Sequence, residues 1–219
     1  VAEGSRGRIY CAPSSEQVDV AAIGKPDDHP DAKIAANPRD FKTPNYGLDT
    51  FSQLFTNRQL TALTTFSDLV HEAQEKAEKD ALAAGLPDDG IGLADHGTGA
   101  RAYGEATGVY LAFAVDKLSD RCSSICSWDP SPKQLSMRNV FGRQAIPMVW
   151  DYAESNPFSA STGSFSNMMS WVIGAFSSYP NHARRGHARQ FDAQSDNGMR
   201  NIVVSTDTPY YDNIGYADL

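Results

Sequence analysis

Residues 57–84 read NRQLTALTTFSDLVHEAQEKAEKDALAA and carry the strongest helical pattern in the chain. Their apolar side chains recur at steps of three and four residues, which places them on one face of a helix: Leu60, Leu63, Phe66, Val70, Ala73 and Ala77. Thr56 or Asn57 can cap the first turn, because a short side-chain oxygen accepts one of its free N–H groups. Gly85 is suited to end the helix. The stretch therefore predicts one long helix that packs against a core.

Three further helices are expected downstream of this stretch. Residues 100–119 and 165–176 have helical periodicity, and residues 146–154 predict a short helix that begins at Pro147. The second helix is rich in small side chains that permit close packing against a neighbour: Ala102, Gly104, Ala106, Gly108 and Ala112. Residues 24–47, with four prolines and two glycines, predict a long loop. The fold class predicted is mainly α (α+β), with a few strands.

Two segments have strand character. Residues 8–12 predict a short strand, and residues 201–206 predict the clearest strand in the chain. Ile202, Val203 and Val204 follow one another without alternation, as in a strand of a parallel sheet that is buried on both faces. Ligands of open α/β sheets lie beyond the carboxyl ends of the strands. The residues that follow this strand are therefore candidates for a site.

Charge is unevenly distributed along the 219 residues, whose formal net charge is -8. The whole chain is thus too acidic for a nucleic-acid coat or for a binder of anionic membranes. Residues 131–200, however, carry 7 basic and 4 acidic residues, while residues 1–130 carry 12 and 20. No apolar run is long enough for a transmembrane helix. A polyanionic partner remains compatible with the basic zone.

The cysteine content favours a reducing compartment, and hence the cytoplasm. The chain has three cysteines, Cys11, Cys122 and Cys126. This small, odd number does not suit a disulfide scaffold. No histidine stands at the spacing of a zinc ribbon or finger, so no metal site is predicted. One interpretation of the chain, to be set beside two others below, is an enzyme that acts on small molecules through Cys122 or Cys126.

The basic zone contains side chains of the types that contact phosphates and base edges. These candidates for DNA contact are Arg138, Asn139, Arg143, Gln144, Arg184 and Arg185. The alternative is that such side chains only tie a loop to its own backbone or lie on a solvated turn. Residue type alone leaves both interpretations open.

Asp207-Thr208-Pro209-Tyr210 is a chemically sensible site for an exocyclic amine. The nitrogen lone pair of adenine or cytosine is delocalised into the ring, so the amine is a poor nucleophile. A carboxylate and a backbone carbonyl can accept both amine hydrogens and favour a more tetrahedral nitrogen. A proline fixes the turn, and an aromatic ring can stack on the extruded base.

This run resembles the Asp-Pro-Pro-Tyr motif of amino-directed DNA methyltransferases. The longer sequence STDTPYYDNIGYADL, residues 205–219, resembles one group of them, the large adenine-specific DNA methylases that contain a zinc-ribbon region. Further stretches resemble the same group in order: 46–48, 54–60, 97–105, 139–145, 148–151 and 156–158. The resemblance thus covers most of residues 46–219.

The resemblance implies roles for the four motif residues. Asp207 would accept a hydrogen of the target amine, Thr208 would offer its carbonyl, Pro209 would set the turn and Tyr210 would stack on the base. The base must leave the duplex to reach them. The implied activity is methyl transfer from S-adenosylmethionine to N6 of adenine in DNA.

Two departures from the group bear on this expectation. Thr208 replaces a proline, which leaves the carbonyl in place but makes the turn less rigid. The group's Phe-Ala-Gly-Gly-Gly cofactor motif and its zinc-ribbon cysteines are absent from these residues. A non-catalytic DNA-binding or interaction module that keeps a decayed motif is therefore the second interpretation.

The resemblance also predicts the organisation of the chain. The chain starts at Val1 without Met and stops just after the motif, so the chain is expected to be an internal fragment that is inactive alone. Residues 1–45 would be a strand and a long loop, and residues 46–200 a helical insertion region that contacts DNA. Residues 201–219 would supply the catalytic strand and turn of an α/β Rossmann-like methyltransferase core.

Overall fold

The computed structural model describes residues 2–4, 7–9, 11–131, 134–143, 145–179, 190–192, 194–196 and 198–208. These residues group into two compact units, Val1–Ile173 and Gly174–Leu219. Helices dominate what is described, which confirms the mainly α prediction. The predicted three-part division of the chain stays a prediction.

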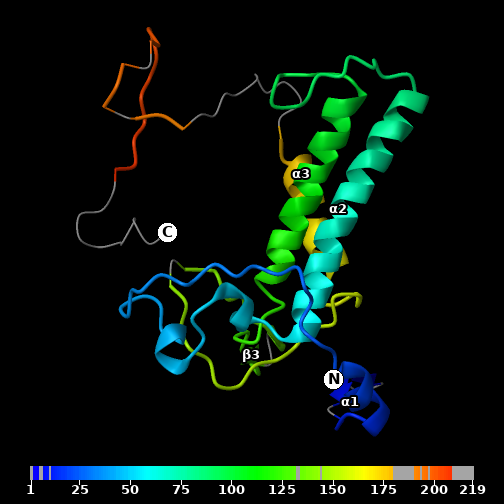
Figure 1. The fold of residues 1–219 in the computed structure, drawn as a ribbon, viewed down its shortest axis with the longest axis vertical. Coiled ribbons are helices and arrows are strands. Elements are labelled where there is room, and N and C mark those ends of the chain that lie inside the picture. The colour runs from blue at the N-terminus through cyan, green and yellow to red at the C-terminus, as the bar shows by residue number, and fades with distance from the viewer. Residues whose placement is uncertain are drawn as a thin grey trace. The chain divides into compact units, whose positions relative to one another are not determined.

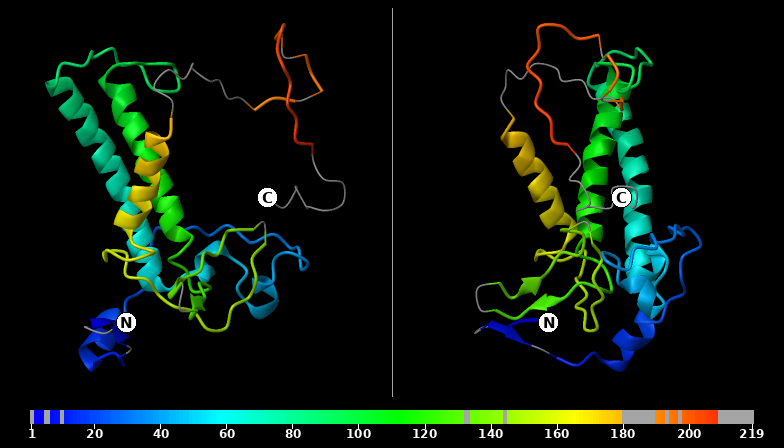
Figure 2. Two further views of the ribbon diagram at one scale, coloured as in Figure 1. Left: turned by 180° about the vertical axis from the view of Figure 1, so that it is seen from behind. Right: turned by 90° about the vertical axis from the view of Figure 1, so that its left-hand side faces the viewer.

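A helical hairpin forms the centre of the first unit. Helix α2 spans Asn57–Ala83 and helix α3 spans Ala100–Ser119, and the two run side by side in Figures 1 and 2. Thr56 accepts a hydrogen bond from the Gln59 N–H at 3.2 Å, and the Gln59 carboxamide accepts one from the Thr56 N–H at 2.8 Å. This capping box starts α2 where the sequence predicts.

The other end of α2 is a Schellman turn. Gly85 adopts φ +93°, and the N–H groups of Gly85 and Leu86 donate to the carbonyls of Leu82 and Ala81. The loop to α3 is held by Glu105, which accepts from the Leu93 N–H at 2.6 Å, and by Arg101, which donates to the Gly90 carbonyl at 2.9 Å. These contacts explain how residues 86–99, which are rich in Gly and Asp, fold as turns.

Small residues bring the two long helices together. A Cβ atom added to Gly104 would lie 2.9 Å from the Gln74 carbonyl oxygen and 3.2 Å from the Glu78 nitrogen, both backbone atoms of α2. Several larger side chains of α3 face outward instead; Tyr103 is 56% exposed and Phe113 52%. The face of α3 that meets α2 around Gly104 and Gly108 is therefore a small-residue face, because only small residues allow this approach.

Helix α4, Phe165–Ser177, completes a second cluster with the hairpin. Met168 and Val172 pack with Ala114, Leu118 and Cys122. The sequence predicted this helix within one residue. Phe176, near the end of α4, is 43% exposed.

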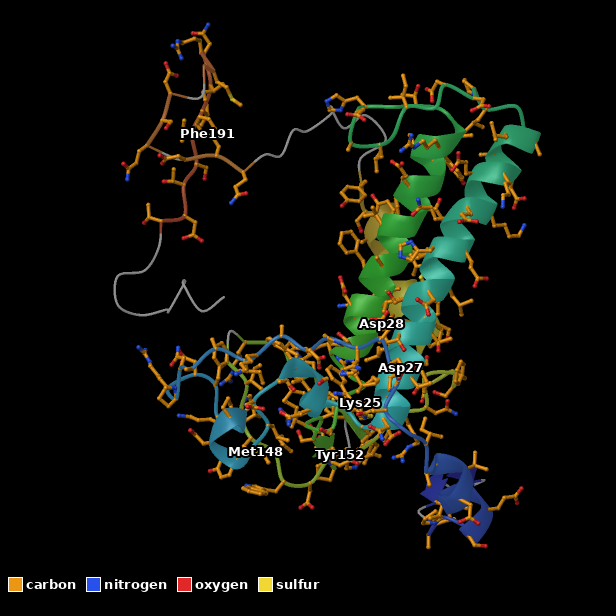
Figure 3. The ribbon with its side chains drawn as sticks, in the orientation of Figure 1. Lys25, Asp27, Asp28, Met148, Tyr152 and Phe191 are labelled. Carbon is orange, nitrogen blue, oxygen red and sulfur yellow. The ribbon has the colours of Figure 1, made fainter. Side chains whose placement is uncertain are left out.

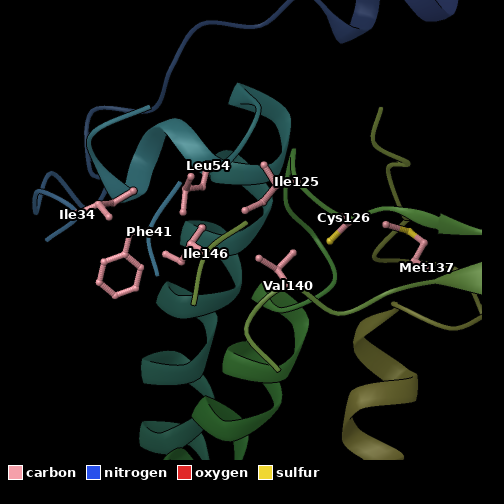
Figure 4. Close-up of a cluster of buried hydrophobic side chains, with 8 residues drawn as sticks. All are labelled: Ile34, Phe41, Leu54, Ile125, Cys126, Met137, Val140 and Ile146. Atoms are coloured by element: carbon pink, nitrogen blue, oxygen red, sulfur yellow. The ribbon is translucent and has the colours of Figure 1, made fainter. Parts of the chain in front are cut away.

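The main core lies beside the N-terminal end of α2 and the C-terminal end of α3 (Figure 1). It is built from loops and short elements. Its buried members, drawn in Figure 4, are Ile34, Phe41, Leu54, Ile125, Cys126, Met137, Val140 and Ile146. The 3-10 helices η1, Thr43–Tyr46, and η2, Phe51–Leu54, cover part of it. The stretch predicted as a long loop thus contributes two core side chains, Ile34 and Phe41.

The described strands are short and antiparallel. Strand β1, Ala2–Gly4, pairs with β2, Gly7–Ile9, and β3, Trp128–Asp129, pairs with β4, Ser136–Met137. The predicted strand at 8–12 is thus shifted toward the N-terminus. A short helix α1, Ser15–Ala21, was not predicted; Ser14 and Gln17 form its capping box.

Two sequence predictions are wrong. Residues 146–154 form no helix; the segment that carries Met148 and Tyr152 in Figure 3 is held as a loop, with Ile146 bridged to Phe41. Residues 201–206, predicted as the clearest strand, form no strand, and Val203 is 99% exposed. A strand exists only through pairing, and neither described hairpin extends to these residues. The Rossmann-like ending stays a prediction.

Candidate functional site

The predicted motif is only partly within the described residues. Asp207 and Thr208 are exposed and lie in neither a helix nor a strand. Pro209 and Tyr210 lie outside the described residues, as do Gln144, Arg184 and Arg185. Both described members of the motif are therefore open to solvent.

Arg138, Asn139 and Arg143 are brought together with two cations that the sequence did not single out. Arg39 and Lys42 line the same groove, of about 490 Å³, as these three residues. Its remaining lining residues are Asp40, Val140, Gly142, Ala145 and Pro147. The lining thus carries four cations and one carboxylate, and two of the cations are ion-paired, Arg39 with Asp40 at 3.9 Å and Arg138 with Asp129 at 2.7 Å. The remaining positive charge suits an anionic ligand.

Backbone pairing positions the two walls of this basic groove. The Lys42 N–H donates to the Ile146 carbonyl at 2.8 Å, and the Ile146 N–H donates to the Asp40 carbonyl at 3.0 Å. These bonds hold residues 40–42 beside residues 145–147, and the buried side chains of Phe41 and Ile146 anchor both segments in the core. The paired segments lie far apart in the sequence, so no local pattern predicts their contact. The only local sign at the first segment is that Arg39 and Lys42 are close together.

Asp120 fixes the loop that carries the basic side chains. Its Oδ1 accepts hydrogen bonds from the N–H groups of Val140 and Phe141, at 2.9 and 2.6 Å. Asp120 follows the last residue of α3, so the loop position is set by the helical hairpin. These hydrogen bonds set the position of the loop from which Asn139 and Arg143 line the groove.

Arg138 is held by an ion pair rather than lying free. Its Nη2 donates to Asp129 Oδ2 at 2.7 Å, while its side chain stays 66% exposed. Hydrogen bonds from Ser131, together with Arg138, lower the pKa of the Asp129 carboxyl below its usual value. Arg138 and Asn139 also line a second, polar cavity of about 690 Å³ together with Arg121. Arg138 therefore lines both the basic groove and the second cavity, and Asp129 balances part of its charge.

Cys122 and Cys126 have the properties of core residues. Both are buried, and burial raises the pKa of their thiols to about 12 and about 11. A nucleophilic cysteine needs a thiolate at working pH, which these environments disfavour. No cluster of three or more potential metal ligands occurs among the residues that the structure describes.

No protein-family model matches the sequence, and neither a curated protein nor a solved structure shows significant similarity to it. In the described part of the chain, no helix has the length and apolar character needed to cross a membrane.

Proposed function

We propose that the chain is part of an S-adenosylmethionine-dependent DNA methyltransferase that modifies N6 of adenine. The observation that carries this proposal is the run Asp207-Thr208-Pro209-Tyr210. It stands inside a longer resemblance to adenine-specific methylases, whose stretches occur in the same order over residues 46–219.

The chemistry assigned to the motif needs an accessible carboxylate. Asp207 is exposed, so its oxygen is open to a hydrogen of the target amine. The Thr208 carbonyl would accept the second hydrogen, and the adenine nitrogen would become a better nucleophile as its lone pair leaves conjugation with the ring. Tyr210 would stack on the extruded base.

DNA as the partner is supported by the basic groove. Arg39, Lys42, Arg138 and Arg143 can neutralise phosphates, which supply most of the sequence-independent affinity for DNA. Asn139 adds a carboxamide of the kind that pairs with base edges. In this proposal the groove binds the DNA backbone through its cationic side chains.

The residues present do not supply the cofactor site. The Gly-rich loop that would bind S-adenosylmethionine in the resembled group does not occur in this sequence, so no contact to the cofactor is assigned to any residue here. We therefore expect the 219-residue chain alone to transfer no methyl group, and the protein that also contains the loop to do so.

The second candidate is a DNA-binding module without catalytic activity. It is favoured by Thr208, which departs from the proline of the motif, and by the absence of a supporting strand at residues 202–206. In such a module the basic groove would work as described, while Asp207 would have no role.

One substitution separates the two candidates. Methyl transfer from radiolabelled S-adenosylmethionine to DNA is measured with the full-length protein and with its Asp207→Ala variant. Asp196→Ala is the matched control, because Asp196 is also an exposed aspartate but forms an ion pair with Arg200. Loss of transfer only in Asp207→Ala supports catalysis by the motif; undiminished transfer in that variant rejects it.

A further inference from the structure

Two exposed aromatic rings meet on the segments that form the basic groove. Tyr46 and Trp150 are in edge-to-face contact, with ring centroids 5.0 Å apart and ring planes at 80°. Trp150 is 72% exposed and Tyr46 is 55% exposed. In such a pair the edge of one ring covers one face of the other, so the remaining ring faces are open to a planar ligand. This pair is called the aromatic platform below.

The aromatic platform stands on the same two chain segments as the walls of the basic groove. Lys42 lines the groove and directly precedes η1, the 3-10 helix that ends at Tyr46. Pro147 lines the groove from the other wall, and Trp150 follows it three residues later. The backbone hydrogen bonds that hold the two walls side by side therefore also bring the two rings together.

The main core anchors the backbone on which both rings stand. After Tyr46 the turn is closed by the Leu48 N–H, which donates to the Thr43 carbonyl at 3.2 Å, and Leu48 packs against the core. On the second wall, Val149 packs against the same core immediately before Trp150. Both rings nevertheless stay largely exposed, so packing in the core does not explain why aromatic residues stand at these two positions.

The charge of the groove selects among the ligands that exposed aromatic rings can bind. The groove is lined by four cations and one carboxylate, and it stays positive when the ion pair of Arg138 with Asp129 is counted. A chain that carries both negative charges and planar groups satisfies the cations and the rings at once. Nucleic acid is such a chain, and its bases are free to stack on a protein only where they are unpaired.

We propose that the basic groove and the aromatic platform together bind single-stranded DNA. Cations of the groove contact the phosphates, and unpaired bases stack on Trp150 and Tyr46. The choice of DNA rests on the proposed function, in which the target adenine must leave the duplex. The preference for a single strand rests on the rings, because a base inside a duplex is covered on both faces by its neighbours.

The test is fluorescence anisotropy of the 219-residue chain with labelled strands of about twelve nucleotides, a length within the site sizes of single-strand binding domains. The ligands are oligothymidylate, the same strand paired with oligodeoxyadenylate, and an abasic strand that has the phosphates but no bases. Oligothymidylate should bind about tenfold or more tighter than the abasic strand, because stacking on two rings is lost without bases. It should also bind more tightly than the duplex. Equal affinities for oligothymidylate and the abasic strand, or tighter binding of the duplex, overturn the proposal.

Substitutions of Trp150 separate stacking from simple apolar contact. Trp150→Leu keeps an apolar side chain but no ring, and should weaken the binding of oligothymidylate about fivefold or more. Trp150→Phe keeps a ring and should retain most of the affinity. Neither variant should change the binding of the abasic strand. The matched control is Trp171→Leu, because Trp171 is also an exposed tryptophan, at 64%, but lies on α4. Equal losses in Trp150→Leu and Trp171→Leu, or in Trp150→Leu and Trp150→Phe, contradict stacking on Trp150.

Failure of this inference can be told apart from failure of the proposed function. Strand preference is measured by binding to the 219-residue chain, whereas the proposed function is tested by methyl transfer with the full-length protein. Duplex bound more tightly than single strand overturns the inference and leaves the methyl-transfer result unaffected. Oligouridylate, the RNA counterpart, should bind no more tightly than oligothymidylate, and tighter binding of the RNA would overturn the choice of DNA. Thermal unfolding shows that each variant compared is folded.

Discussion

Arg58 and Glu154 form a bidentate ion pair between residues that are 96 positions apart. Arg58 is the second residue of α2, and Glu154 precedes the Asn156-Pro157-Phe158 turn. The hydrogen bond to Glu154 raises the pKa of Arg58 above its usual value. The pair therefore fastens the turn to the start of the long helix α2.

A double-mutant cycle should reveal this coupling. Arg58→Ala, Glu154→Gln and the double variant are unfolded with urea, and we expect a coupling energy of about 1 kcal/mol, since both partners are partly shielded and two hydrogen bonds are aligned. The Lys76–Asp80 pair on α2 is the control; both side chains are mostly exposed, and about 0.3 to 0.5 kcal/mol is expected. A coupling no larger than in this control would contradict the role given to the pair.

Gly104→Ala should destabilise the protein although alanine favours helices. The added Cβ would meet backbone atoms of α2 at 2.9 and 3.2 Å, so the helices must move apart, at a cost of about 1 to 3 kcal/mol. Gly174→Ala in α4 is the matched control. Nothing lies within 4 Å of its added Cβ, so a gain of about 0.5 to 1 kcal/mol is expected. Changes in the free energy of unfolding that have the same sign for both variants would refute the close approach of α2 and α3.

The two buried thiols should make stability fall at high pH. Burial raises their pKa values to about 12 and about 11, whereas an unfolded thiol ionises near pH 8.5. Below pH 8.5 both states keep the proton and the contribution is constant. Above it only the unfolded state releases protons, so the free energy of unfolding decreases by about 1.4 kcal/mol per pH unit for each thiol.

The measurement is urea unfolding at pH 8 and at pH 10.5. The Cys122→Ala, Cys126→Ala double variant should show a flatter decline than the unchanged protein. The Cys11→Ala variant, in which an exposed cysteine is removed, should show the same decline as the unchanged protein. A decline unaffected by the double variant would assign the pH dependence to other groups.

The basic groove predicts a salt-dependent affinity for DNA in the 219-residue chain. Arg39→Ala and Arg143→Ala should each weaken binding to duplex DNA and lower the slope of log affinity against log salt by about 0.9 if each side chain contacts one phosphate. Fluorescence anisotropy over a salt series measures both. Lys79→Ala is the control, because it removes an exposed cation outside the groove. A slope that changes equally in all three variants would mean that only the total charge matters.

The parts of the fold that the sequence predicts are those with local causes. The Thr56 cap and the Gly85 stop depend on residues within one turn, and the limits of α2, α3 and α4 follow almost to the residue. Pro147 is compatible with a helix start, yet the bridge between Phe41 and Ile146 holds that segment as a loop.

The candidate site was less predictable for the same reason. Arg138 and Arg143 were chosen by residue type, but Arg39 and Lys42 reach them only through backbone pairing with distant residues. The valines at 203 and 204 have strand propensity but no described partner strand, and propensity alone does not form a sheet.

The most direct test of the methyltransferase proposal is the identification of the methylated product. DNA is incubated with the full-length protein and S-adenosylmethionine that carries a deuterated methyl group, then digested to nucleosides and analysed by mass spectrometry. The account predicts N6-methyl-2′-deoxyadenosine that carries the deuterated methyl group, and none when Asp207 is replaced by alanine. DNA without any deuterated methyl group, or with the label only on cytosine, would contradict it.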